Sequence, residues 1–281
     1  MDRRLFTVNL PMSAKPQGRG PLRLALLIAS VLLVLSQPVQ AQDADALAKK
    51  LSNPVAALIS VPFQYTYDDG YANGGYRHTL NIQPVAPFSI AEEWNVISRT
   101  ILPLAYQKDV VPGTDQAGMG DITQSFFFSP KETGSSGILW GIGPALLLPT
   151  GTDDLGADTW GAGPTFVVLK QDKSWTVGAL VNHISDIAGT GSGRRDISNT
   201  FVQPFLAKAL PGGRTLAFNI ESTYDWKASQ WTAPLNIQYS RVSKLGSQMI
   251  SYQGGVRAYL DGPRGGPDWG VRFTVTLLYP K

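Results

Sequence analysis

The chain has 281 residues, 43% of them hydrophobic, and its lack of cysteine excludes disulfides, thiolate metal sites and cysteine nucleophiles. Its formal net charge of +3 arises in the first 41 residues, which hold five of the 24 Lys and Arg residues but one of the 21 Asp and Glu residues. The remainder carries 19 basic and 20 acidic side chains, so it lacks the basic excess of a nucleic-acid-binding protein, and we expect no nucleic-acid partner.

Residues 1–41 are predicted to be a secretory signal peptide. Basic residues at five positions precede an apolar run over 24–35, and Val39-Gln40-Ala41 follows that run. This order is typical of an export signal, cleaved here after Ala41. A transmembrane anchor is the alternative, but a spanning helix needs about 20 apolar residues and this run is shorter.

Residues 42–57 are predicted to form a short N-terminal segment on the periplasmic side, or a small plug. A helix is expected over 43–51, because Asp43 lies at its start and Lys49 and Lys50 lie in its last turn, as the helix dipole favours. Asn53-Pro54 then ends the helix.

Residues 58–281 alternate between apolar and polar side chains at period two, which is typical of β-strands with two different faces. In the last segment Phe273 and Val275 share an apolar face, while Arg272 and Thr274 share a polar face. About twelve such segments are expected, near 58–67, 77–84, 93–106, 119–129, 138–149, 159–170, 174–185, 198–209, 214–225, 230–241, 248–259 and 269–279.

These segments predict an all-β fold: a closed antiparallel transmembrane β-barrel of about 12 strands over 58–281. An even number of strands of about ten residues is typical of bacterial outer-membrane barrels. Short connections near 171–173, 211–213 and 242–244 are expected to be periplasmic turns. Longer connections over 68–75, 108–118, 150–158, 186–196 and 261–268 are expected on the opposite side. Both termini are then periplasmic.

Charged and amide side chains inside the predicted strands are candidates to line the lumen. A charge on the lipid face costs about 2 to 4 kcal/mol at mid-bilayer, so these side chains should point inward. Two interpretations stay open: a salt-bridge network that braces a blocked interior, or a polar path through it. The candidate residues are Arg99, Glu221, Arg257, Arg272, Asn236 and Gln238.

No catalytic residue, metal site or cofactor is predicted. His78 and His183 are the two histidines and lie far apart in the sequence. His183 is close to Ser185 and Asp186, but such neighbours on a strand are expected to alternate faces. Acidic loop residues are expected to be solvated, with divalent-cation binding as the alternative. These residues are Asp68, Asp69, Asp153, Asp154 and Asp158.

A series of short motifs runs in order along the mature chain: Asn53-Pro54, Gly143-Pro144, Trp160-Gly161-Ala162-Gly163-Pro164, Gln203-Pro204-Phe205, Asp225-Trp226 and the stretches 59–64, 80–84, 87–89, 94–100, 102–103, 118–121, 148–150 and 268–273. Together these motifs resemble the bacterial outer-membrane transporter family of the MetA-pathway phenol-degradation type, often mislabelled neuromedin U. The resemblance covers nearly the whole mature chain. It implies a barrel and an outer-membrane address, but no catalytic residues. The chain departs from many outer-membrane barrels by ending in Tyr279-Pro280-Lys281 instead of an aromatic residue.

Architecture and resemblance together predict passage of small hydrophobic or aromatic compounds through the outer membrane. The expected partners are outer-membrane lipids and lipopolysaccharide, the barrel-assembly machinery during biogenesis, and a small-molecule substrate. A lipid-modifying enzyme of the outer membrane is one alternative function. A structural barrel with a sealed lumen is the other.

Overall fold

The computed structural model describes residues 41–72, 74–152, 155–189 and 194–280. The predicted signal peptide, apart from Ala41, lies outside the described residues. One helix, α2 (Ala41–Leu51), precedes the strands. The strands are β1 (Ile59–Asp69), β2 (Tyr76–Ile82), β3 (Val85–Ser89), β4 (Trp94–Lys108), β5 (Asp115–Met119), β6 (Ile122–Pro130), β7 (Ile138–Leu148), β8 (Thr159–Asp172), β9 (Trp175–Gly189), β10 (Ser198–Leu210), β11 (Arg214–Ile220), β12 (Ser222–Asp225), β13 (Gln230–Thr232), β14 (Pro234–Leu245), β15 (Gln248–Tyr259) and β16 (Trp269–Tyr279).

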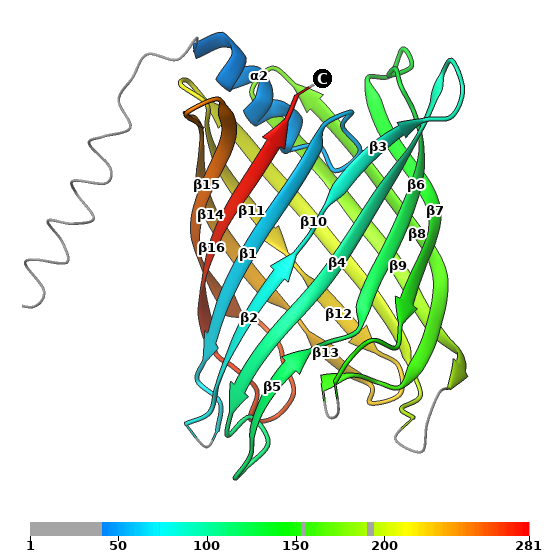
Figure 1. Ribbon diagram of the computed structural model, residues 1–281, viewed down its shortest axis with the longest axis vertical. Helices are drawn as coiled ribbons and strands as arrows, with labels where there is room; N and C mark the ends of the chain where they lie inside the picture. The colour runs from blue at the N-terminus through cyan, green and yellow to red at the C-terminus, as the bar shows by residue number, and fades with distance from the viewer. Residues whose placement is uncertain (1–40, 73, 153–154, 190–193, 281) are drawn as a thin grey trace, which may run out of the picture. The chain divides into compact units, whose positions relative to one another are not determined.

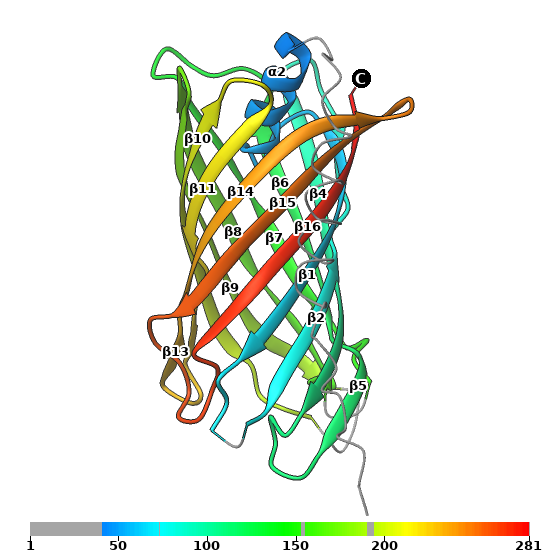
Figure 2. The same cartoon turned by 90° about the vertical axis from the view of Figure 1, so that its left-hand side faces the viewer.

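The sheet closes on itself as an antiparallel barrel (Figures 1 and 2). The first and last strands pair along their whole lengths, from Ile59 opposite Tyr279 to Asp69 opposite Trp269. Four passages through the wall are each split into two strands: β2 with β3, β5 with β6, β11 with β12, and β13 with β14. The sixteen strands therefore make twelve passages, and the predicted closed barrel of about twelve strands is confirmed.

Prolines lie at two of these interruptions. Pro84 falls between β2 and β3, and Pro234 begins β14 just after β13 ends. A proline has no N–H to donate to the ladder, so the regular pairing is broken locally. Hydrogen bonds beside each break keep the strands together, because Thr100 N donates to Pro84 O (3.1 Å) and Glu221 N donates to Pro234 O (3.0 Å).

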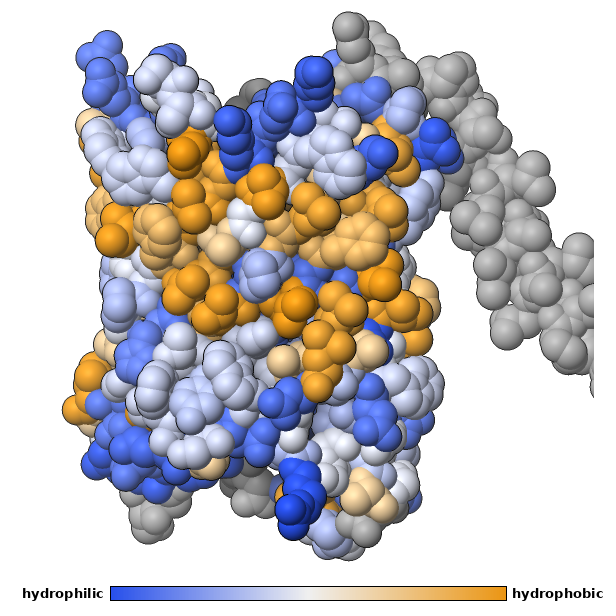
Figure 3. Space-filling model, turned by 180° about the vertical axis from the view of Figure 1, so that it is seen from behind, coloured by the Kyte–Doolittle hydropathy of each residue, from blue (hydrophilic) through white to orange (hydrophobic). Residues whose placement is uncertain are grey.

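The barrel wall is apolar outside and mixed inside, the reverse of a water-soluble protein. On β16, Phe273 is 57% exposed on the outer surface, whereas Arg272 next to it is 4% exposed and faces the interior. Figure 3 shows the apolar side chains gathered in a band around the middle of the visible face, with hydrophilic side chains at both ends. Such a band, closed by a barrel without sheet edges, is the surface that a bilayer core accepts.

The two ends of the barrel differ. At the terminus end, where α2 and the C-terminus lie in Figure 1, tight turns join β8 to β9, β10 to β11 and β14 to β15. At the opposite loop end, longer connections follow β1, β4, β7, β9 and β15. Six of the seven tryptophans are exposed: Trp94 and Trp175 begin strands at the terminus end, and the others lie near the loop end. The remaining four are Trp160, Trp226, Trp231 and Trp269.

Five of the eight expected connections were placed wrongly at the level of single residues. Those over 68–75 and 171–173 each begin two residues later, because β1 continues to Asp69 and β8 to Asp172. The turn expected over 242–244 lies after Leu245, because β14 continues to that residue and pairs with β15 throughout. The loop expected over 108–118 contains β5, which pairs with β4 at the loop end. The loop expected from Asp186 begins later, because β9 continues to Gly189. In each case strand pairing continues through residues that were expected to lie in the connection.

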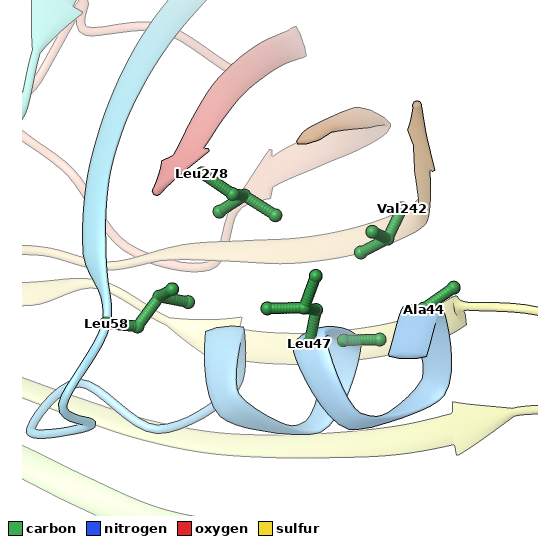
Figure 4. Packing of buried hydrophobic residues seen from close by; sticks show 6 residues of the cluster. Ala44, Leu47, Leu58, Val242 and Leu278 are labelled. Carbon is green, nitrogen blue, oxygen red and sulfur yellow. The ribbon is translucent and has the colours of Figure 1, made fainter. Parts of the chain in front are cut away.

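Helix α2 packs its apolar face across the terminus end. Ala44, Leu47 and Ala48 contact Leu58 of the β1 approach, Val242 of β14 and Leu278 of β16 (Figure 4). Two hydrogen bonds fix its position: Gly213 N donates to Asp45 Oδ1 (2.5 Å), and Gln171 Nε2 donates to Lys49 O (2.9 Å). Gly213 has a φ of +69°, and a Cβ there would lie 2.9 Å from the Ala44 Cβ. A glycine is therefore required both for the turn and for the close approach of the helix.

The barrel interior has two unlike walls. The apolar wall contains Ile97 of β4, Phe127 of β6, Val167 and Leu169 of β8 and Leu180 of β9, all nearly inaccessible. Val55, from the segment after α2, packs into this cluster inside the barrel. The opposite wall, from β1, β14, β15 and β16, is polar: Thr66, Asn236, Ser251 and Thr274 are buried there.

Candidate functional site

Three of the six candidate lumen residues, Glu221, Arg257 and Arg272, form one network with Asp68. The guanidinium of Arg272 donates twice to the carboxylate of Glu221, from Nη1 to Oε1 (2.7 Å) and from Nη2 to Oε2 (2.8 Å). Arg257 lies 3.5 Å from the same carboxylate and 3.5 Å from Asp68 Oδ1. Arg99 has no salt bridge with a described residue.

The network joins strands from distant parts of the chain. Asp68 is on β1, Glu221 lies between β11 and β12, and Arg257 and Arg272 are on β15 and β16. Arg272 Nε also donates to Thr66 Oγ1 (3.3 Å) on β1. Paired arginine and carboxylate forks are rigid because both groups are planar and bond twice. This half of the polar wall is braced by charge pairing.

Asn236 and Gln238 lie next to each other on the inner face of β14, both buried. Asn236 Nδ2 donates to Asn219 Oδ1 (2.9 Å) on β11, while its own Oδ1 has no partner among the described residues. Gln238 Nε2 also has none. Buried polar atoms without partners are rare in proteins, and those that occur in a cavity are met by water or a ligand.

Arg99 differs from the other interior arginines. Its Nη2 donates to Gln83 Oε1 (3.1 Å), and its Nε and Nη1 have no partner among the described residues yet are not sealed from the cavity surface. It is on β4, between Ile97 and Ile101, whose side chains point the same way into the barrel. The guanidinium therefore lies where the apolar wall meets the polar wall.

Two cavities occupy the interior. One, of about 290 Å³, lies under α2 at the terminus end, and its apolar lining includes Leu51, Leu58, Val85, Leu180 and Phe205. The other, of about 390 Å³, lies toward the loop end, and its lining includes the whole charged network. Six polar side chains line both cavities, so the two spaces meet there. This shared ring consists of Gln64, Gln83, Arg99, Gln203, Asn219 and Gln238.

The structure places five of the six predicted lumen candidates on these cavities. Arg99 and Gln238 line both, and Glu221, Arg257 and Arg272 line the loop-end cavity. Asn236 is fully buried in the polar wall. The predicted candidates did not include Gln64, Gln203 and Asn219. Each is a polar residue between apolar neighbours on a strand, and this pattern was the available signal.

Asp68 was expected in a solvated loop, and that expectation is wrong. It is the tenth residue of β1 and faces inward at 5% exposure, beside Arg257. Asp69 faces the other way and accepts hydrogen bonds from Tyr67 Oη (2.8 Å) and Gly70 N (2.7 Å). Asp153 and Asp154 lie outside the described residues. Among the residues that are described, no group of three or more His, Asp or Glu side chains is placed to hold a metal ion.

The expectation that His183 and Ser185 lie on different faces is also wrong. Residues two apart on a strand share a face, and His183 Nε2 lies 2.9 Å from Ser185 Oγ. Its Nδ1 lies 2.9 Å from Thr200 Oγ1 on β10, which also accepts a hydrogen bond from Trp226 Nε1 (2.8 Å). This cluster is on the outer surface, since the inward positions of β9 are those of Leu180 and Ile184.

His78 is also on the outer surface and contacts the tyrosines of the neighbouring strands. Its Nδ1 lies 2.6 Å from Tyr65 Oη, and its ring is within 6 Å of the rings of Tyr67, Tyr76 and Tyr106. Aromatic rings with a polar group are typical of the interfacial girdles of outer-membrane barrels. The two histidines are thus separate, as their sequence distance indicated.

In the described part of the chain, no helix is long and apolar enough to cross a membrane.

Comparison with known proteins finds a likeness of fold but none of sequence family. No family model matches the sequence, and no curated protein matches it. Among solved structures, the fold is similar to that of an outer membrane channel from Pseudomonas putida F1, with a TM-score of 0.61 and 16% identity over 79% of this chain and 94% of that channel. The β domain of the Bordetella autotransporter BrkA aligns with a TM-score of 0.38 and 14% identity over 78% of this chain and 98% of that domain, a match too weak to bear on the fold. The chain is thus a closed β-barrel similar in fold to an outer membrane channel.

Proposed function

We propose that the protein is an outer-membrane channel for small hydrophobic or aromatic compounds, of the MetA-pathway phenol-degradation type. The observation that carries this proposal is the pair of cavities that meet at the shared ring inside the barrel. A barrel serving only as a structural element gains nothing from unpaired polar atoms in its interior, because each costs free energy to bury. The likeness to a Pseudomonas channel supports the same interpretation.

The apolar wall supports passage of compounds with a hydrophobic part. Small-molecule sites are largely apolar with a few placed polar groups, and the terminus-end cavity has this character. Phe201 and Phe205 pack against the buried apolar cluster from β10 and also line the cavities. An aromatic substrate that contacts these two phenylalanines is shielded from water during part of its passage.

Under this proposal the barrel lies in the outer membrane with the loop end outward. Its apolar band contacts outer-membrane lipid, and the exposed loop end faces lipopolysaccharide. The barrel-assembly machinery would insert it, with Tyr279 at the end of β16 serving in place of a C-terminal aromatic residue.

Single-channel recording tests the proposal. The purified mature protein, refolded in detergent and added to a planar bilayer in KCl, should give discrete conductance steps. A control chain carrying Phe63→Asp and Phe273→Asp on the lipid face should insert poorly and give fewer events, because each carboxylate must enter the hydrocarbon. Wild-type protein that is folded and inserted but gives no steps supports a sealed structural barrel instead.

The cluster of His183, Ser185 and Thr200 favours one further candidate, a lipid-modifying enzyme. A serine hydroxyl beside a histidine that a second group orients is the arrangement of an activated nucleophile. Neither cavity is lined by these residues, so the candidate site is separate from the lumen. Release of fatty acid from phospholipid micelles, lost in both Ser185→Ala and His183→Ala, is required by this function. Wild-type protein without hydrolysis removes the candidate.

A further inference from the structure

The interior arginines divide into two kinds. Arg257 and Arg272 are neutralised by Asp68 and Glu221, within 3.5 Å. Arg99 is the arginine of the loop-end cavity lining that has no carboxylate partner among the described residues. That lining therefore holds three arginines against two carboxylates, and the unpaired positive charge is at the shared ring.

We infer that the shared ring is a binding site for an organic anion with an apolar ring, whose carboxylate is held by Arg99. The inference rests on the proposed channel function and specifies its substrate class. Carboxylates match the planar fork of a guanidinium, and the charge-assisted hydrogen bonds that result are the strong ones.

Two observations besides the charge point to an anionic ligand. The Nε and Nη1 groups of Arg99 reach the cavity surface without an acceptor among the described residues. Gln238 is 5% exposed, lines both cavities and has an Nε2 donor with no partner in the described structure. Both groups offer N–H donors, which an anion needs and a cation does not.

The cavity residues on either side of the shared ring indicate the chemistry of the rest of the ligand. The apolar side chains of Val85, Leu180 and Phe205 lie on the terminus-end cavity, which Arg99 also lines. A carboxylate bound at Arg99 therefore leaves its apolar part in contact with these residues. At about 290 Å³ the cavity is near the lower end of typical small-molecule sites, about 300 to 1,000 Å³. A single ring with one carboxylate is the ligand of that size and polarity.

Block of the single-channel current tests the inference with three probes. Benzoate has both the ring and the charge, acetate has the charge without the ring, and benzamide has the ring without the charge. We expect benzoate to reduce the current at the lowest concentration. In a KCl gradient the channel should also prefer chloride to potassium, as pores with unpaired arginines do.

Variants separate charge from apolar contact. Arg99→Gln should raise the half-blocking concentration of benzoate about tenfold, the effect of losing one charge-assisted hydrogen bond, and should remove the preference for chloride. Arg99→Lys should keep the preference for chloride and part of the benzoate block. Phe205→Ala should weaken block by benzoate but not by acetate. Arg194→Gln, an exposed loop residue paired with Asp186, is the matched control and should change none of these values.

The inference is overturned if Arg99→Gln binds benzoate as wild type does, or if benzoate and acetate block equally. Heat-modifiable gel migration shows whether each variant has folded, and Arg99→Lys keeps the test valid if Arg99→Gln has not. If the wild-type protein does not conduct, the channel proposal fails separately, and calorimetric titration of the detergent-solubilised barrel tests the site. The same order of affinities then supports an anion site in a closed barrel, while no binding of benzoate overturns it.

Discussion

Glu221 is the carboxylate that holds two guanidinium groups in the barrel interior. Arg272 bonds to it through two hydrogen bonds, and Arg257 reaches it at 3.5 Å while also approaching Asp68. These residues come from β1, β15, β16 and the β11–β12 junction. The network therefore connects the first and last strands to the β11–β12 junction. The charges thus stabilise one wall and leave the neighbouring Arg99 free to act on a ligand.

Glu221→Gln should destabilise the barrel by about 3 kcal/mol, at the lower end of the range for breaking a buried ion pair, because a fifth of the Glu221 side chain is open to the cavity. The loss leaves Arg272 without a carboxylate partner and leaves Arg257 with Asp68 alone. Urea unfolding in detergent micelles measures it. Asp196→Asn, which removes exposed ion pairs with Arg194 and Lys227, should cost less than about 1 kcal/mol. Equal stability of Glu221→Gln and wild type would show that the network does not brace the wall.

At this scale the sequence predicted which residues matter but not how they pair. A charged residue in an apolar strand must face inward, and that argument placed Arg99, Glu221, Arg257 and Arg272 among the candidates. Partner choice depends on the tilt and stagger of strands far apart in the chain, which no local pattern encodes. Asp68 was assigned to a loop for the same reason, since its partner Arg257 is 189 positions away in the sequence.

Helix α2 is the element that covers the terminus-end cavity. Ala48 and Leu51 line that cavity, while Leu47 packs on the wall residues Val242 and Leu278. Val55 follows the helix into the barrel and packs against the apolar wall. Passage through the barrel therefore requires the segment to move or to leave room beside it.

Leu47→Asp should release α2 and raise the single-channel conductance. A carboxylate in place of Leu47 would be buried among apolar side chains, and the cost of its desolvation exceeds the two hydrogen bonds that hold the helix. The conductance should rise because the helix no longer obstructs the cavity under it. Asp43→Asn, an exposed change on the same helix, should leave the conductance unchanged. A Leu47→Asp channel with wild-type conductance would mean that α2 does not obstruct the pore.

The strands were predicted best where their inner faces belong to the polar wall of the barrel. On β14, β15 and β16 apolar residues face outward and polar residues face the interior, so the alternation was clear. On β7, β8 and β10 both faces are largely apolar, because Leu139, Leu169 and Phe205 face an apolar interior. Alternation is then weak, and glycines and prolines interrupt it further. The division of the lumen into two walls could not be predicted from the pattern.

At the scale of the whole molecule, the proposed membrane insertion depends on closure of the barrel. β1 and β16 lie at opposite ends of the strand sequence, yet they pair over eleven residues each. Without this pairing both strands would present unpaired backbone groups to lipid, at a cost of several kcal/mol per group.

Because the chain has no cysteine, an introduced pair reports closure directly. Phe63→Cys with Val275→Cys, at paired positions of β1 and β16, should form a disulfide on mild oxidation, since paired residues on antiparallel strands have Cα atoms about 4.5 to 5.5 Å apart. Phe63→Cys with Tyr279→Cys is the control, because four residues along β16 add about 13 Å. Non-reducing gels distinguish the cross-linked chain by its faster migration. Equal cross-linking of both pairs, or of neither, would contradict the register.

Refolding of the mature chain into phospholipid vesicles tests the membrane-spanning barrel most directly. The unheated sample should migrate on a gel as a compact band that shifts to the unfolded position after boiling, and this band should form with lipid or detergent but not in buffer alone. The apolar band of the outer surface requires that dependence. A folded, monomeric protein that stays soluble in buffer without detergent would contradict the account.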